Sequence, residues 1–227
     1  RIYPFVGSMR GTFPEPVVYE NARKFAGMIA SHLREAGVEK EPLGVDLAEI
    51  TFLRALEAEG IRVVDGQQTI LKAEAIKTPE EIALIETSIA INEAAFWEVI
   101  QFAKPGVREN EINGLMRNVM YSLGAEEIQN INVITGERSH PHPHDHSDRI
   151  LQIGDLIFID VVNVFLGYKT CYYQTFVTGR PSQRQLDVHK QVYEWLAKAT
   201  ELIRPGVSTA DVARVWPTAQ ELGLADE

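Results

Sequence analysis

The residues best suited to chemistry lie between positions 154 and 179. An apolar stretch there carries one carboxylate, Asp160, and the next stretch carries the only cysteine of the chain, Cys171. The two stretches predict a β-hairpin with a tight turn around residues 165–166, which would set Asp160 opposite Cys171 with their Cβ atoms about 5 Å apart. Phe158 would share the strand face of Asp160, and a carboxylate in an apolar row needs a cation, a metal or hydrogen-bond donors. The spacing alone favours the alternative, an aspartate at a solvent-exposed strand end.

A second group of candidate residues is the histidine-rich run 139–148, Ser-His-Pro-His-Pro-His-Asp-His-Ser-Asp. The two prolines in it exclude a helix and donate no backbone hydrogen bonds, so we expect a stiff, extended loop. Alternate residues of an extended chain share a side, which would bring the histidines together. Imidazoles titrate near neutral pH and can act as general acids or bases. The alternative is a surface loop that is merely rich in histidine and binds adventitious metal.

The elements that must position these residues form two units. Residues 1–75 are expected to be the end of a small α/β domain, because helical patterns alternate there with short apolar strands, and residues 76–227 to be a larger α/β (α+β) unit. The first 19 residues have no clean periodicity. Helices are predicted over 20–36, 50–59, 79–103, 109–123, 182–203 and 209–222, and strands over 42–46, 61–64, 128–135, 156–164 and 168–177.

The larger unit contains a candidate internal repeat. Residues 103–112 match residues 203–212 around a Pro-Gly-Val tripeptide, and each copy stands between a long helix and a second helix closed by Leu-Gly. The alternative is coincidence, since Pro-Gly commonly ends helices. If the repeat is real, the second copy reaches Glu227 where its sheet should begin. We therefore expect a pseudo-twofold domain whose second sheet half, and half of whose site, lie beyond this chain, and we expect the gene product to begin before Arg1.

The hairpin resembles the metal-binding hairpin of the creatinase/aminopeptidase ("pita-bread") superfamily. The resemblance lies in Asp160 at the end of a Gly-Asp-apolar strand, a second ligand position eleven residues later, and the pattern Gly-Tyr-x6-Thr-Phe-x2-Gly. The family includes Xaa-Pro dipeptidases, aminopeptidase P, methionine aminopeptidase and creatinase. The resemblance implies a catalytic domain of two α-β halves, preceded in the prolidase and creatinase branches by a smaller domain.

The resemblance also implies site residues. Asp160 matches the first metal-binding aspartate, whereas Cys171 stands where metallopeptidase members have a bridging aspartate, and Gln174 where they usually have arginine. A thiolate binds Zn²⁺ well, but it is a poor ligand for the hard, carboxylate-rich sites that Mn²⁺ or Co²⁺ usually fill. The family histidine that touches substrate corresponds to His142 or His144. Of Tyr172 and Tyr173, the candidate substrate-binding residues, we expect one to face the pocket and one to pack behind the sheet.

Three functions follow as hypotheses for the intact protein. The first is hydrolysis of a C–N bond in a small amide or Xaa-Pro dipeptide with a divalent metal (Zn, Mn or Co) held at Asp160 and Cys171. The second is creatinase-like hydrolysis without metal, in which His142 or His144 activates water. The third is a peptide- or protein-binding module that has lost catalysis. A sulfonium lyase is disfavoured, because Val162 stands where that branch has an acidic ligand. We expect the 227-residue chain alone to be inactive and metal-free.

Composition limits the partners. The net charge is −10 without a long Lys/Arg cluster, which argues against nucleic acid. No apolar run approaches the roughly 20 residues of a membrane helix. One cysteine excludes an internal disulfide and, with no signal peptide recognisable, fits the cytoplasm. Family resemblance implies a homodimer.

Overall fold

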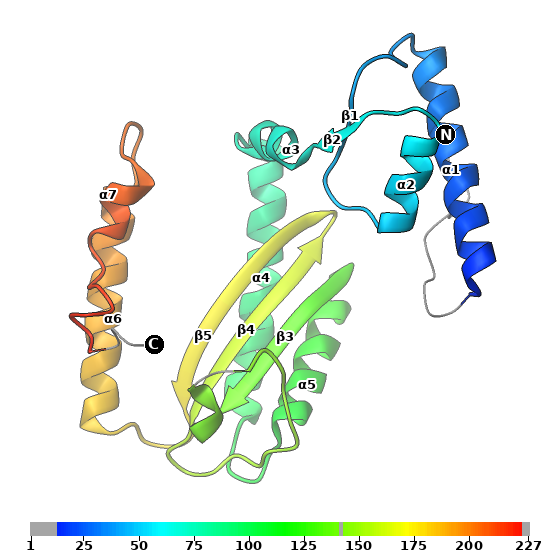
Figure 1. Ribbon diagram of the computed structural model, residues 1–227. Helices are drawn as coiled ribbons and strands as arrows, with labels where there is room; N and C mark the ends of the chain where they lie inside the picture. The colour runs from blue at the N-terminus through cyan, green and yellow to red at the C-terminus, as the bar shows by residue number, and fades with distance from the viewer. Residues whose placement is uncertain (1–12, 141–142, 224–227) are drawn as a thin grey trace. The chain divides into compact units, whose positions relative to one another are not determined.

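The computed structural model describes residues 13–140 and 143–223, and the chain divides into two compact units (Figure 1). The first is Arg1–Thr78 and the second Pro79–Glu227, whereas the sequence predicted a boundary between residues 75 and 76. Among the described residues, no helix combines the length and apolarity needed to cross a lipid bilayer.

The described part of the first unit, residues 13–78, contains two parallel strands and three helices. The strands are β1 (Leu43–Val45) and β2 (Val63–Asp65), and the helices are α1 (Glu15–Glu35), α2 (Ile50–Ala58) and α3 (Gln67–Glu74). Alanines of α1 pack against Leu56 of α2, which is fully buried. Helix α1 begins five residues before the predicted start at residue 20, directly after Pro14, because proline is compatible with the start of a helix but not with its interior. Helix α3 was not predicted, and none of its residues is buried.

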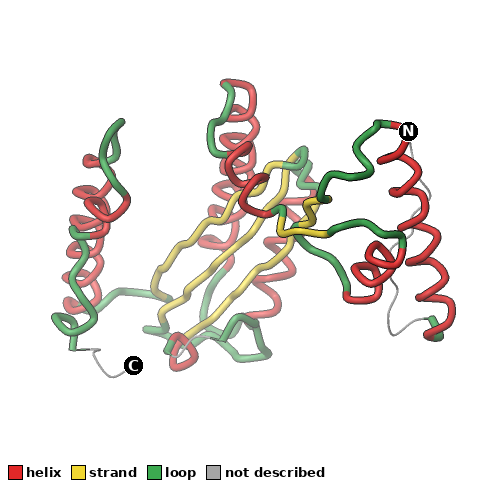
Figure 2. The backbone as a smooth tube through the Cα atoms, turned by 45° about the horizontal axis from the view of Figure 1, so that its top comes forward, coloured by secondary structure: helices red, strands yellow, loops and turns green. Residues whose placement is uncertain are grey.

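The second unit has a three-stranded antiparallel sheet with two helices on one face. The strands β3 (Glu127–Thr135), β4 (Leu156–Phe165) and β5 (Tyr168–Val177) lie in the order β3-β4-β5. The helices α4 (Pro79–Phe102) and α5 (Glu109–Ser122) lie side by side behind this sheet in both views (Figures 1 and 2), α4 against β4 and β5, and α5 against β3. Strand residues alternate between the helix-covered face and the opposite face.

The hairpin between β4 and β5 forms as predicted, but its register differs by two residues. Leu166 and Gly167 make the turn with φ of 47° and 81°, a two-residue connection that pairs Phe165 with Tyr168. Asp160 therefore pairs with Tyr173, and the prediction that it lies opposite Cys171 is wrong. Because the side-chain period of a strand is two, this error leaves Cys171 on the same face as Asp160.

The last two helices are α6 (Gln183–Leu202) and α7 (Thr209–Ala213), which pack against each other. Trp195 and Trp216 meet edge to face with ring centroids 6.2 Å apart. A helix was expected over residues 209–222, and α7 is much shorter. Pro217 explains the difference, since proline lacks the N–H that continues a helix and its ring clashes with the preceding turn.

The core of the second unit lies between the sheet and the two helices that cover it. Buried side chains from both helices and from β3 and β4 contribute: Ile91, Ala95, Phe96, Val99, Ile112, Met116, Met120, Ile131, Val133, Ile157, Ile159 and Val161. Phe96 contacts Tyr172 of β5, with ring centroids 5.5 Å apart. The face that bears Asp160 is thus the one that α4 and α5 leave uncovered.

Ile112→Ala should destabilise this unit by about 2–5 kcal/mol, because it empties part of a fully buried position. The matched control is Ile153→Ala, which shortens a side chain that is 80% exposed and should change the free energy of unfolding by at most about 0.5 kcal/mol. Urea denaturation followed by circular dichroism measures both. Equal effects of the two substitutions would show that the core is placed wrongly.

Candidate functional site

The candidate site is a row of three side chains across the sheet. Asn132 of β3 pairs with Asp160 of β4, which pairs with Tyr173 of β5. Cys171 lies in the adjacent row, where it pairs with Val162. All these residues lie on the face opposite α4 and α5, since their neighbours in sequence fill the core.

Asp160 is 8% exposed and both of its carboxylate oxygens have a donor. Asn132 Nδ2 donates to Oδ2 at 3.0 Å, and the thiol of Cys171 donates to Oδ1 at 3.4 Å. The sequence required a buried carboxylate here to have a cation, a metal or hydrogen-bond donors; the structure supplies donors. Asn132, itself fully buried, was not anticipated, and its Oδ1 has no partner among the described residues.

Cys171 and Tyr173 form a coupled pair beside this carboxylate. Burial raises the pKa of the Cys171 thiol; a hydrogen bond from Tyr173 lowers it, and the bond that the thiol donates to Asp160 raises it again. The hydrogen bond with Cys171, followed by the negative charge of Asp160, raises the pKa of the Tyr173 hydroxyl to about 12. The Tyr173 ring is exposed and lies 6.0 Å from that of Phe158, between centroids. The chain thus presents a carboxylate, a protonated thiol and a phenol together.

The neighbouring residues on β5 point to the other side. Tyr172 packs against Phe96 of α4 and its hydroxyl lies 3.4 Å from Glu93 Oε1. One tyrosine therefore accompanies Asp160 and the other lies behind the sheet. As a substrate-binding candidate, Tyr172 is on the wrong face to act together with Asp160, because adjacent strand residues face opposite sides. Gln174 has the same parity as Tyr172.

Asp160 and Cys171 supply too few donors for a metal centre on their own. Catalytic zinc sites use three protein ligands and structural sites use four. Among the described residues, no group of three or more His, Cys, Asp or Glu side chains could hold a metal ion. In addition, a thiol must lose its proton to bind metal, whereas this thiol keeps its proton and donates a hydrogen bond to Asp160. The part of the chain that the structure describes therefore does not supply a complete metal site.

The histidine-rich segment lies beyond the end of β3. A short 3-10 helix, η1 (Gly136–Ser139), leads into it. His142 lies outside the described residues, and His144 is exposed. His146 is partly buried, and its Nδ1 lies 3.2 Å from Asn113 Nδ2. The structure thus does not bring a described histidine into the row of Asp160.

Both ends of this segment converge on a residue that the sequence analysis did not single out. Glu109 is fully buried at the start of α5, and its carboxylate accepts hydrogen bonds from Thr135, Arg138 and Ser147. The only signal in the sequence is an acidic residue in the first turn of a helix, which is common for electrostatic reasons alone.

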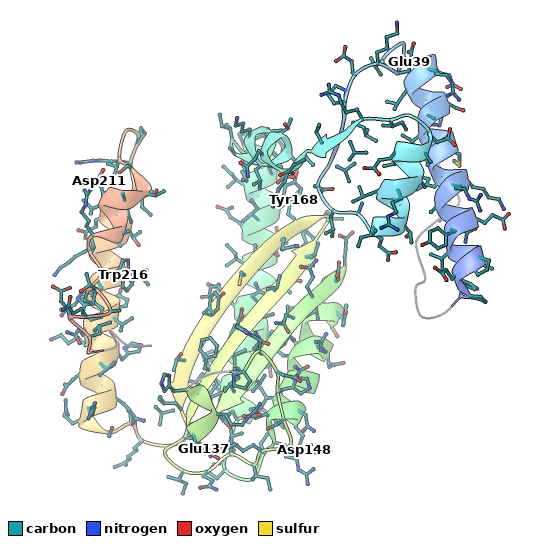
Figure 3. The ribbon with its side chains drawn as sticks, viewed as in Figure 1. Glu39, Glu137, Asp148, Tyr168, Asp211 and Trp216 are labelled. Carbon is teal, nitrogen blue, oxygen red and sulfur yellow. The ribbon has the colours of Figure 1, made fainter. Side chains whose placement is uncertain are left out.

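A second charged group fastens the segment nearby. Arg149 binds Glu137 of η1 and Asp155, which leads into β4. The hydrogen bond from Arg149 lowers the pKa of Glu137 to about 2. Figure 3 shows Glu137 and Asp148 at one end of the sheet and Tyr168 at the other. At the end of the sheet that carries Tyr168, the hydroxyl of this residue donates to Glu81 of α4 at 3.0 Å. Hydrogen bonds therefore connect both ends of the sheet to helices.

Cys171→Ala should lower the pKa of Tyr173 from about 12 towards its ordinary 10.0, because the main cause of the shift is removed. Tyrosinate absorbance after rapid pH jumps, with Tyr173→Phe as the subtracted reference, measures it. Since the folded pKa is raised, the contribution of Tyr173 to stability is present below pH about 10 and is lost as the pH rises through about 12. Thr175→Ala is the control and should leave the midpoint unchanged; a wild-type midpoint near 10 would contradict the arrangement.

Known proteins share this architecture. Residues 83–225 match the model of metallopeptidase family M24. Over 138 residues the chain is 30% identical to the Xaa-Pro dipeptidase of Pyrococcus furiosus, covering 60% of this chain and 40% of the relative. It is 25% identical over 198 residues to the dimethylsulfoniopropionate lyase of Roseobacter denitrificans, covering 83% and 44%. The X-Pro aminopeptidase structure from Thermotoga maritima superposes with a TM-score of 0.72 at 24% identity, covering 84% of this chain and 55% of that one.

The chain thus spans about half, or less, of the length of the proteins it matches. The similarity of fold confirms the pita-bread architecture that the hairpin motif indicated. The family match covers the sheet, its two helices and the segment after β5. It therefore includes the whole row of Asn132, Asp160 and Tyr173. This chain therefore belongs to metallopeptidase family M24.

Proposed function

We propose that the intact protein hydrolyses C–N bonds in small amides, with Xaa-Pro dipeptides as the first substrates to test. The observation that carries this proposal is Asp160, a buried aspartate on the sheet face that α4 and α5 leave uncovered. The resemblance to the family's metal-binding hairpin is what gives it the role of the first metal-binding aspartate. The Xaa-Pro dipeptidase among the relatives supports this choice of substrate class.

The residues of this chain would then serve as follows. Asp160, held by Asn132, is the fixed negative charge of the site, and Tyr173 offers a hydroxyl and a ring to a substrate on the same face. His142 or His144 remains the proposed proton carrier. Asp160 and Cys171 remain the proposed contribution to a divalent metal, Zn, Mn or Co, which when bound would activate water.

One observation favours a second candidate, in which the site works without metal. Both oxygens of Asp160 are engaged by donors, one of them the thiol of Cys171. The resemblance to the family's hairpin implies a second aspartate at that position. Such a site suits either creatinase-like hydrolysis through a histidine or the binding of a peptide without turnover. Localisation in the cytoplasm and assembly as a homodimer stay predictions, which cell fractionation and light scattering would test.

Asp160→Asn should lower amidase activity by about 100-fold or more, because loss even of groups that only orient metal ligands costs 10–100-fold. Steady-state hydrolysis of Xaa-Pro dipeptides by the full-length protein, with and without added Zn²⁺, Mn²⁺ or Co²⁺, measures it. The matched control is Asp187→Asn, which changes an exposed aspartate of α6 that accepts a hydrogen bond from Gln183, and this variant should retain full activity.

Cys171→Asp distinguishes the two candidates. A metal-dependent enzyme should bind Mn²⁺ more tightly after this change, since a carboxylate suits that ion better than a thiolate. Elemental analysis of the purified proteins provides the readout. Full wild-type activity in the presence of a chelator would overturn the metal-dependent candidate, and turnover of no substrate with retained peptide binding would overturn hydrolysis altogether.

A further inference from the structure

We propose that Glu109 is a positioning residue that fixes both ends of the histidine-rich segment relative to β3. We call Glu109, Arg138 and Ser147 the Glu109 clamp. The effect of the clamp on catalysis rests on the proposed hydrolase function, whereas the hydrogen bonds that form the clamp do not.

Every partner of the Glu109 carboxylate is a donor. Oε1 accepts from the backbone N–H and the hydroxyl of Thr135, both at 2.8 Å. Oε2 accepts from the backbone N–H of Ser147 at 2.8 Å, from its hydroxyl at 2.6 Å, and from Arg138 Nη1. A carboxylate is an acceptor-only group, which matches five donors; an amide in its place would bring two donors of its own.

The partners come from the two ends of one segment. Arg138 precedes the histidines and Ser147 follows them, and Arg138 Nη1 also donates to Ser147 Oγ at 2.7 Å. Arg138 Nη2 reaches inward to the carbonyl of Asp145 at 2.9 Å. Arg138 and Ser147, which flank the histidines, therefore meet at one buried charge.

The backbone of α5 holds the same end of the loop. The N–H of Glu109 donates to the carbonyl of Arg149, and the N–H of Asn110 to that of Ser147, both at 3.1 Å. These are amides of the first helical turn, which have no partner within the helix. The first turn of α5 thus serves as the surface on which the segment is seated.

The arrangement assigns Glu109 a role in positioning and leaves it no part in the reaction. Its side chain is fully buried and each of its oxygens already has two or more donors. Through Thr135 it is joined to β3, the strand that also carries Asn132, the partner of Asp160. One carboxylate therefore sets the distance between the segment that supplies histidines and the strand that orients Asp160.

Hydrogen exchange tests the clamp independently of activity. Ser147→Ala removes one hydroxyl that bonds both Glu109 and Arg138, and the amides of Glu109, Asn110, Thr135 and Ser147 should lose protection by about tenfold or more. The amide of Leu151, bonded to the carbonyl of Val107 at 2.8 Å, is the internal reference and should be unchanged. Ser208→Ala removes a comparable hydroxyl at the start of α7 and is the matched control.

The catalytic arm uses the same variants of the full-length protein. Ser147→Ala should lower kcat by about 10- to 100-fold with little change in KM, because misplacement of a catalytic group by about 1 Å costs up to 100-fold. Ser147→Thr, which keeps the hydroxyl, should restore most of the rate, and Glu109→Gln should reproduce the loss more severely.

The outcomes separate the two proposals. Unchanged protection of the four amides in Ser147→Ala and Glu109→Gln would overturn the clamp, whatever the activity. Lost protection with unchanged kcat would overturn the positioning role. If the wild-type protein hydrolyses no amide, the proposed function fails, and the exchange experiment still decides whether the clamp exists.

Discussion

The second unit depends on one buried negative charge. Glu109 lies at the start of α5 and gathers donors from the end of β3, from η1 and from the residue that closes the histidine-rich segment. A buried carboxylate is costly unless donors surround it, and here they come from three separate pieces of chain. Loss of the charge would leave Arg138 without its charged partner in the clamp, and removing one member of a buried ion pair costs more than the pair itself contributes. The helix, the sheet and the segment are therefore stable only together.

Asp160 is a second buried carboxylate, on the other face of the sheet, and fewer donors compensate for its burial. Its two donors, Asn132 and Cys171, come from the strands on either side. A second aspartate in place of Cys171 would put two carboxylates side by side, and these would need a cation or a shared proton between them. The thiol removes that requirement by donating a hydrogen bond to Asp160. The cysteine that the sequence analysis treated as a poor metal ligand thus has a physical role as a hydrogen-bond donor.

The sequence predicted the sheet and its covering helices well because both follow from local patterns. Apolar periodicity placed α4, α5 and the three strands to within about two residues. Apolar periodicity could not give the hairpin register, because the turn at Leu166 determines it. Leu166 has a positive φ there, which is an unusual conformation for leucine. Nor could it find Glu109, whose partners lie 26, 29 and 38 residues away. Contacts of that kind follow from tertiary structure and leave no periodic trace.

A single irregularity in β3 makes both charged groups possible. Ile128 pairs with Asn163 and Asn130 with Val162, so Gln129 is an extra residue in the ladder. Such a bulge reverses the alternation of faces, which lets Ile128 and Ile131 both enter the core although they are three residues apart. Without the bulge, a strand that buried Ile128 would turn Asn132 towards the helices. Asp160 would then lose the hydrogen bond that Asn132 donates. The same parity places Thr135 on the helix side, within reach of Glu109. The bulge at Gln129 thus allows β3 to donate hydrogen bonds to Asp160 from one face and to Glu109 from the other.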